Sequence, residues 1–210
     1  MNKIIIVEYG MCNVGSIVNM LKKVRVPCEV TADPDKVAAA DKLILPGVGA
    51  FGAGMQNLHQ RGLVPALKHA AQDRKIPILG ICLGMQLLTQ HSEEGGGEGL
   101  ALIDAHTRRF DFSSLNLPRK LPIPHMGWNE VRPQQDSLLL RDVNETQRFY
   151  FVHTFHVVCH QQQDRLYTAE YGYEFDAGLQ HDNIIGVQFH PEKSHRFGLQ
   201  LLKNFAEAAC

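Results

Sequence analysis

The residues of this sequence best suited to chemistry surround one cysteine. In the stretch PILGICLGMQLL, Cys82 stands between Gly80 and Gly84, where an apolar strand-like run passes into helix-forming residues. This is the nucleophile-elbow pattern G-x-S-x-G with cysteine in place of serine. Such a turn presents the sulfur at the carboxyl edge of a sheet and at a helix N-terminus, where the helix dipole favours the thiolate. The glycines omit side chains where strand and helix cross most closely.

The same turn would leave the backbone N–H of Leu83 free to bind an oxyanion. The alternative is an inert cysteine packed at a strand–helix junction, because free cysteine often behaves as a small hydrophobic residue. A partner for the thiol is needed to decide between the two.

The sequence GVQFHPEKSH supplies a candidate base for this thiol. Residues two apart in an extended segment share a face, and Pro191 restricts the backbone between His190 and Glu192. The carboxylate can therefore hold one imidazole nitrogen while the other faces the sulfur. We predict a catalytic triad of Cys82, His190 and Glu192. A loop histidine paired with a nearby acid is the alternative interpretation.

A second histidine-rich segment, HTFHVVCH, invites a metal site. If the segment is one strand, His153 and Cys159 share one face while His156 and His160 share the other. The four side chains then cannot converge on one ion, and no H-E-x-x-H motif is present. We predict no metal site.

The loop PGVGAFG matches the dinucleotide pattern G-x-G-x-x-G through Gly47, Gly49 and Gly52. It follows a later strand instead of the first, and Asp73, about twenty residues on, precedes its strand. We therefore expect no nicotinamide or flavin cofactor. The loop is expected beside the cysteine strand, where the N–H of Val48 or Gly49 could face an oxyanion. A plain turn is equally compatible with the pattern.

The elements that must position these residues alternate between apolar runs and amphipathic segments. We predict strands at 3–9, 27–32, 42–46 and 76–81, and helices around 17–24, at 33–41 and at 63–72. After Leu100 further strand-like runs occupy 148–158, 165–171 and 183–190, and a helix covers 197–209. This alternation predicts one α/β domain over 1–210, with a mostly parallel sheet, helices on both faces and an antiparallel extension. The segment SEEGGGEG is expected to be a solvated loop without a chemical role.

Composition narrows the possible partners. The 210 residues are 44% hydrophobic and carry a net charge of -1, so no nucleic acid or anionic membrane partner is expected. No membrane span or signal peptide is expected either. The five cysteines are odd in number and scattered, which disfavours a disulfide framework. We expect a cytoplasmic protein.

Taken together, these motifs resemble the class I glutamine amidotransferases. The chain is most similar to the glutaminase subunit of imidazole glycerol phosphate synthase, through LILPGVGAFG, ILGICLGMQLL, PHMGWNEV, YFVHTFHVV and GVQFHPEKS in the order and spacing of that family. This resemblance covers nearly the whole chain. It implies a flavodoxin-like fold and hydrolysis of glutamine to glutamate and ammonia, with ammonia passed to a TIM-barrel cyclase subunit in histidine biosynthesis.

The resemblance also implies roles for individual residues. Leu83 and the Val48/Gly49 loop would bind the oxyanion, and Gln86, Thr154 and Phe155 would hold the glutamine. The partner interface would include Asn13, Trp128, Tyr150 and Lys193. In this family the glutaminase has little activity until the partner binds its own substrate.

The chain departs from this family at two places. Phe155 stands where the family often has tyrosine, and YGMCN is a variant of the family's N-terminal loop. Three different functions also remain open. Related subunits serve sugar amination or amidination in surface polysaccharide synthesis, and HRFG with GYEF is similar to those. The chain could also be a stand-alone γ-glutamyl hydrolase or a non-catalytic binding module, although a binding module would be expected to lack part of the triad.

Overall fold

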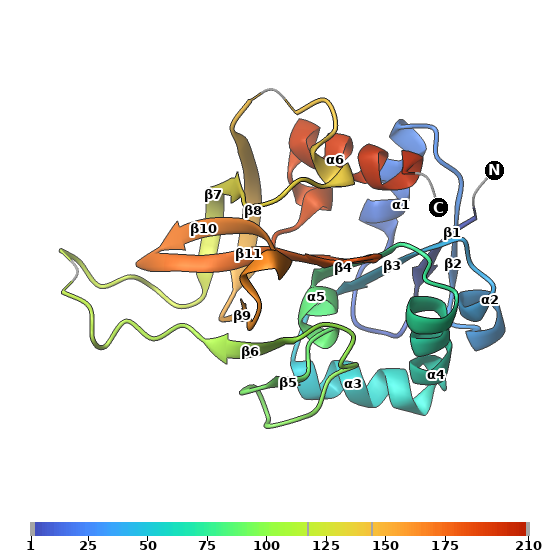
Figure 1. Cartoon of the computed structure of the whole chain (residues 1–210), viewed down its shortest axis with the longest axis horizontal. Coiled ribbons are helices and arrows are strands. Elements are labelled where there is room, and N and C mark those ends of the chain that lie inside the picture. The colour runs from blue at the N-terminus through green and yellow to red at the C-terminus, as the bar shows by residue number, and fades with distance from the viewer. Residues whose placement is uncertain (1–2, 117, 144, 209–210) are drawn as a thin grey trace.

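The computed structural model describes residues 3–116, 118–143 and 145–208 of the chain. Its centre is a parallel sheet of five neighbouring strands in the order β2-β1-β3-β4-β12 (Figure 1). Their bounds are β1 (Ile4–Val7), β2 (Cys28–Thr31), β3 (Lys42–Gly47), β4 (Ile78–Cys82) and β12 (Ile184–Val187). Strands β1, β3, β4 and β12 are buried throughout, which explains why their sequences, apart from Lys42, are apolar and do not alternate.

Helices cover both faces of this sheet, as the alternation of patterns predicted. Along β1, Ile4 and Ile6 belong to one buried cluster and Ile5 and Val7 to another. The first cluster includes residues of α1 (Gly15–Lys23) and α6 (His195–Glu207), and the second includes residues of α2 (Pro34–Ala38), α3 (Phe51–Gln60), α4 (Leu63–Lys68) and α5 (Leu83–Leu87). In Figure 1 the sheet is seen between these two groups of helices.

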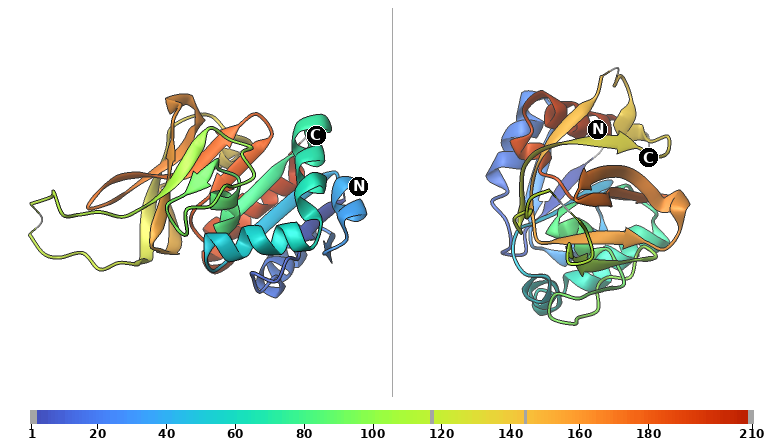
Figure 2. Two further views of the ribbon diagram at one scale, coloured as in Figure 1. Left: turned by 90° about the horizontal axis from the view of Figure 1, so that it is seen from below. Right: turned by 90° about the vertical axis from the view of Figure 1, so that its left-hand side faces the viewer.

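An antiparallel extension continues the sheet beyond β12. The order β12-β11-β10-β7-β8 runs through β11 (Tyr173–His181), β10 (Arg165–Tyr171), β7 (His125–Pro133) and β8 (Gln147–His153). A branch formed by β9 (Phe155–Cys159), β6 (Ala105–Arg109) and β5 (His91–Ser92) joins it through the pairing of β9 with β11. Figure 2 shows the extension at the opposite end of the molecule from the two termini. The predicted α/β architecture is confirmed.

The predicted strand over 148–158 is not continuous. It breaks at Thr154, so that β8 pairs with β7 while β9 pairs with β6 and β11. The assumption that His153 and Cys159 share one face of a single strand was therefore wrong. The predicted helix at 63–72 also changes character, because α4 ends at Lys68 and a π-helical turn (His69–Asp73) follows.

Short 3-10 turns complete the described elements, at Leu138–Leu140, Gln162–Asp164 and Pro191–Lys193. The last of these turns directly follows His190 and contains Glu192. No helix of the described ranges is long and apolar enough to cross a membrane.

Candidate active site

Cys82 ends β4 and caps the N-terminus of α5, at the turn that the sequence pattern predicted. Its backbone has φ 52° and ψ -109°, a conformation that costs free energy for a residue other than glycine. A Cβ on Gly84 would lie 1.7 Å from the carbonyl oxygen of Leu45, and one on Gly80 would lie 2.8 Å from the backbone nitrogen of Met85. Both glycines are therefore required where strand and helix cross, and the tight turn is built into the packing.

His190 and Glu192 lie beyond the end of β12, the strand that pairs in parallel with β4. Nδ1 of His190 donates to Oε1 of Glu192 at 2.7 Å. The His190 backbone is fixed as well, because its N–H donates to the carbonyl of Tyr150 at 2.9 Å and its carbonyl accepts from the Ser194 hydroxyl at 2.6 Å. The side chain is 1% exposed. The imidazole is thus held in one orientation.

Burial alone would lower the pKa of His190, but the interactions with Cys82 and Glu192 outweigh it and raise the pKa to about 9. The ring therefore carries a proton at neutral pH. Its Nε2 is buried and makes no hydrogen bond to the described residues. Cys82 therefore interacts electrostatically with the ring but forms no hydrogen bond of normal geometry with its Nε2. Hydrogen bonds between catalytic groups often become shorter only when substrate binds.

A pocket of about 220 Å³ opens in front of Cys82. Its walls come from the elbow, from the PGVG loop and from the strand break around Thr154. Among its lining residues are Val48, Gly49, Leu83, Gln86, Thr154 and Phe155, the residues that the resemblance assigned to the oxyanion and the substrate. The structure places all six around one space with the sulfur.

Glu94 also lines this pocket, although its segment SEEGGGEG was expected to have no chemical role. Its carboxylate accepts from the backbone N–H of Phe51 at 2.8 Å, at the N-terminus of α3. This contact fixes the loop against the pocket. Nothing in the segment SEEGGGEG signals this contact, because an acidic and glycine-rich composition is typical of a solvated loop.

Gln188 is a second residue that the sequence analysis did not select. It is fully buried, and its Nε2 donates to the Sγ of Cys82 at 3.6 Å while its Oε1 accepts from Nε2 of Gln86 at 3.0 Å. A signal for it was available, because the predicted strand over 183–190 would put Gln188 on the same face as His190, although β12 itself ends at Val187.

The PGVG loop lies beside the nucleophile, with Gly47 paired to Cys82 in the sheet register. The N–H of Val48, however, donates to the carbonyl of Met11 at 2.6 Å. Gly49 follows with φ 129°, a backbone conformation that L side chains rarely adopt. In this conformation the N–H of Val48 is already bonded to Met11. The N–H of Leu83, in the first turn of α5, is better placed than the N–H of Val48 to bind an oxyanion.

Three of the residues expected at a partner interface form one exposed aromatic patch. The Trp128 ring is 6.3 Å from the ring of Tyr150 and stacks on His195 at 5.5 Å, and Nζ of Lys193 lies 5.9 Å above the Tyr150 ring. Trp128 is 41% exposed. Asn13 is not part of these contacts. Its side chain accepts from the backbone N–H of Gly15 at the start of α1. Helix α1 itself packs against the Pro191–Lys193 turn.

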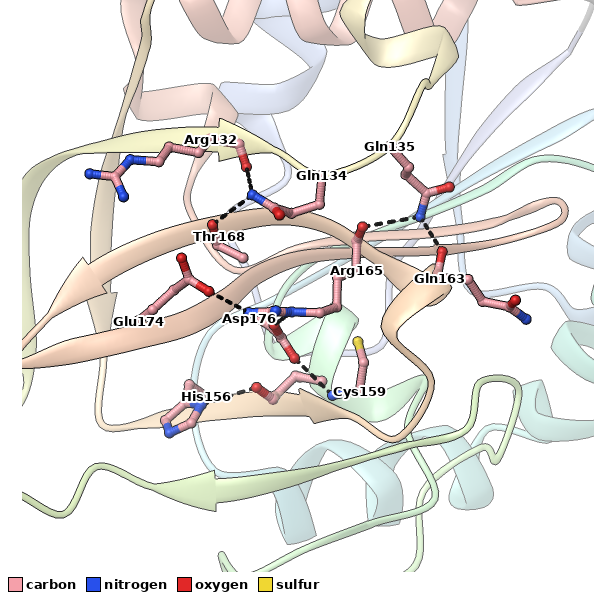
Figure 3. A network of polar contacts seen from close by, with 11 residues as sticks. Arg132, Gln134, Gln135, His156, Cys159, Gln163, Arg165, Thr168, Glu174 and Asp176 are labelled. Carbon is pink, nitrogen blue, oxygen red and sulfur yellow. Dashed lines mark hydrogen bonds and ion pairs between the residues drawn. The ribbon is translucent and has the colours of Figure 1, made fainter.

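The HTFHVVCH segment forms no metal site within the described residues. Figure 3 shows His156 and Cys159 apart on β9, with the backbone N–H of Cys159 bonded to the Asp176 carboxylate. Asp176 also pairs with Arg165, which in turn reaches Glu174. The Asp176 carboxylate thus has partners other than a metal ion.

Known proteins resemble this chain over almost its full length. The family model for glutamine amidotransferase class-I matches residues 5–209. Proteins named imidazole glycerol phosphate synthase subunit HisH 2 are similar: the one from Methanococcus maripaludis is 48% identical over 98% of this chain and 100% of its own, and the one from Pseudomonas aeruginosa is 46% identical over 97% and 98%.

Solved structures support the fold. A putative GMP synthase protein from Thermoplasma acidophilum has a TM-score of 0.73 at 18% identity, covering 98% of this chain and 92% of its own. PurLQS from Thermotoga maritima has a TM-score of 0.70 at 16% identity, covering 98% of both chains. The full-length match to the family model and the identities near one half lead to one conclusion: the chain belongs to the class I glutamine amidotransferases.

Proposed function

We propose that this chain is the glutaminase subunit of an imidazole glycerol phosphate synthase. It hydrolyses glutamine to glutamate and ammonia for histidine biosynthesis, through Cys82, His190 and Glu192. The observation that carries the proposal is the elbow itself: Cys82 is held at positive φ facing a pocket that Leu83 and Gln86 line, while His190 is paired with Glu192. The names of the similar proteins support the pathway.

The reaction begins when the Cys82 sulfur, as the thiolate, attacks the side-chain amide carbon of glutamine. The carbonyl oxygen becomes an oxyanion, which the N–H of Leu83 stabilises at the helix N-terminus. His190 is protonated at neutral pH because its pKa is raised to about 9, so it can give its Nε2 proton to the departing ammonia. This leaves a γ-glutamyl thioester on Cys82.

Water then completes the cycle. His190, now neutral, takes a proton from a water molecule that attacks the thioester carbon. The C–S bond breaks, glutamate leaves, and the imidazole again carries its proton. Glu192 orients the ring in both steps through its bond to Nδ1.

The ammonia would be used by a second protein, which we propose to be a TIM-barrel cyclase bound over Trp128, Tyr150 and Lys193, with Asn13 at its margin. The exposed aromatic patch supports this placement, because Trp and Tyr are enriched at protein interfaces. We further propose that residues 1–210 act as one domain and that the protein works in the cytoplasm. The free thiols of Cys12, Cys28, Cys82 and Cys159 support a reducing compartment.

The test is a glutaminase assay on the purified chain, with and without a co-expressed barrel partner that is supplied with its nucleotide substrate. We expect low basal turnover, strong stimulation by the liganded partner, and loss of both in Cys82→Ser. Rapid turnover without any partner would favour a stand-alone hydrolase. Stimulated turnover that survives Cys82→Ser would remove this residue from its role.

A further inference from the structure

Two buried histidines outside the proposed triad form a hydrogen-bonded chain that ends at the pocket wall. Nδ1 of His153 lies 2.8 Å from the carbonyl oxygen of Phe155. A carbonyl can only accept, so His153 carries its proton on Nδ1 and its Nε2 is an acceptor. Nδ1 of His125 lies 2.9 Å from that Nε2 and must be the donor. The remaining nitrogen of His125 accepts from the side-chain amide of Asn129 at 3.4 Å.

Burial keeps this pair uncharged. It lowers the pKa of His125 to about 4 and the pKa of His153 well below 6.5. A proton added to His153 would place two N–H groups face to face between the rings, and one added to His125 would point an N–H at the amide donor of Asn129. Packing fixes the rings as well, because Tyr171 stacks on His125 at 4.0 Å and Phe151 stacks at 4.9 Å. Both tautomers are therefore determined at neutral pH.

The pocket end of the chain sets the orientation of Gln86. The Phe155 carbonyl accepts a second hydrogen bond, from Nε2 of Gln86 at 3.2 Å. The other Nε2 proton goes to Gln188, whose own amide reaches the sulfur of Cys82. With both Nε2 protons donated, the oxygen Oε1 is the atom of the Gln86 amide that is left for a ligand in the pocket.

We propose that His125 and His153 are positioning residues for the substrate: they hold the Phe155 carbonyl at the strand break, so that Gln86 presents an acceptor to a donor group of glutamine, such as its α-ammonium. The inference rests on the proposed function, because it assigns glutamine to this pocket. The hydrogen bonds of the pair go to Phe155 and Asn129 and not to the reacting sulfur or the imidazole of His190. Loss of the pair should therefore weaken substrate binding far more than it slows the chemical steps.

The experiment is a calorimetric titration of glutamine into the full chain carrying Cys82→Ser, which does not depend on hydrolysis. Adding His153→Leu removes the bond to Phe155 and should weaken the Kd about tenfold. Adding His153→Asn should leave the Kd within about threefold, because the Asn amide can place a donor where Nδ1 stands. His125→Phe keeps the ring stacking but leaves Nε2 of His153 unpaired, and should weaken binding severalfold.

His156 provides the matched control. Its ring contacts the same Phe110 ring as His153 does, but its nitrogens bond to the carbonyl of Val157 and the hydroxyl of Tyr173. His156→Leu should cost stability, read as a lower melting temperature, without changing the Kd for glutamine. In the otherwise wild-type enzyme, His153→Leu should raise KM with little change in kcat.

Several results would overturn the inference. One is a His153→Leu protein that binds glutamine as tightly as its parent, and another is a His153→Asn protein as weak as His153→Leu. A parent Cys82→Ser protein that binds no glutamine would also end it. Failure of the proposed function has a different signature, which is glutamine binding without hydrolysis by the wild-type complex.

Discussion

Cys82 and His190 are brought together by strand pairing and not by proximity in sequence. Strands β4 and β12 are parallel neighbours, with Ile81 paired to Val187. Their carboxyl ends therefore meet at one edge of the sheet, where a nucleophile and a base that follow them must face each other. Glu192 then needs only one short turn after Pro191 to reach Nδ1 of His190.

Among substitutions of single site residues, Glu192→Gln is the most informative. Removing the carboxylate should lower the pKa of His190 from about 9 towards its ordinary 6.5 and reduce stimulated glutaminase activity by about 10- to 100-fold. The measurement is an NMR titration of the His190 ring beside a pH–rate profile. A His190 pKa that is the same in both proteins would contradict the proposed pairing.

The raised pKa has a consequence for stability with a definite sign. A group whose pKa is higher in the folded state than in the unfolded state adds stability that is complete below the unfolded pKa, here about 6.5. That contribution is lost as pH rises through about 9. In Glu192→Gln the total loss should be smaller and should end at a lower pH, because only the folded-state pKa falls, and denaturant titrations between pH 6 and pH 10 would measure this.

The residue types of the proposed triad could be selected from spacing alone, since G-x-C-x-G and H-P-E each imply a geometry. Glu94 could not be selected, because its role depends on how a glycine-rich loop returns to the N-terminus of α3. The hydrogen bond from the N–H of Val48 to the carbonyl of Met11 could not be predicted either. A hydrogen bond between two loops has no periodic signature in the sequence.

At the scale of elements, the crossing of β4 and α5 is the most constrained feature of the site. Gly84 has no room for a side chain, because a Cβ would overlap the Leu45 carbonyl of β3. Gly84→Ala should lower the free energy of unfolding by about 3 kcal/mol or more. The measurement is chemical denaturation followed by circular dichroism.

Gly52 is the matched control for this substitution. It lies near the start of α3 with nothing within 4 Å of its missing Cβ. Gly52→Ala should therefore leave stability unchanged or raise it by about 0.5 kcal/mol, since alanine favours helix more than glycine does. A Gly84→Ala protein as stable as Gly52→Ala would show that the crossing is not tight.

The buried parallel strands were predictable because each is a short, continuous apolar run. Helix α3 and strands β7 and β11 were not predicted. Helix α3 contains Gly52 and Gly54, which weaken its helical signal, although Phe51, Met55 and Leu58 mark a buried face. Strand β7 contains few apolar residues, and its pairing with β8 and β10 depends on tertiary context.

At the scale of the whole molecule, the sheet has two different ends. The β2 edge lies beside the helical layers, whereas strands β7 and β8 carry Trp128 and Tyr150, and Lys193 of the Pro191–Lys193 turn completes the patch with them. The patch is connected to the site through the backbone, because the Tyr150 carbonyl accepts from the N–H of His190. A partner seated there would be next to the proposed base.

Trp128→Ala should therefore weaken binding of the proposed barrel partner by about 30-fold, the effect of losing a well-packed aromatic anchor. Val30→Ala is the control, because Val30 is similarly exposed, at 37%, but lies on β2 at the other end of the sheet. The measurement is the Kd of the two proteins by surface plasmon resonance. Equal affinities for the two variants would place the interface elsewhere.

Covalent trapping can show whether Cys82 is the nucleophile. Burial raises the pKa of Cys12 to about 12 and also raises the pKa of the thiols of Cys28 and Cys159, which makes those three poor nucleophiles at neutral pH. The complex would be treated with a chloromethyl ketone analogue of glutamine and mapped by mass spectrometry. We expect one adduct, on Cys82, which excess glutamine suppresses. An adduct on another cysteine that abolishes activity while Cys82 stays unmodified would contradict the assignment of Cys82 as the nucleophile.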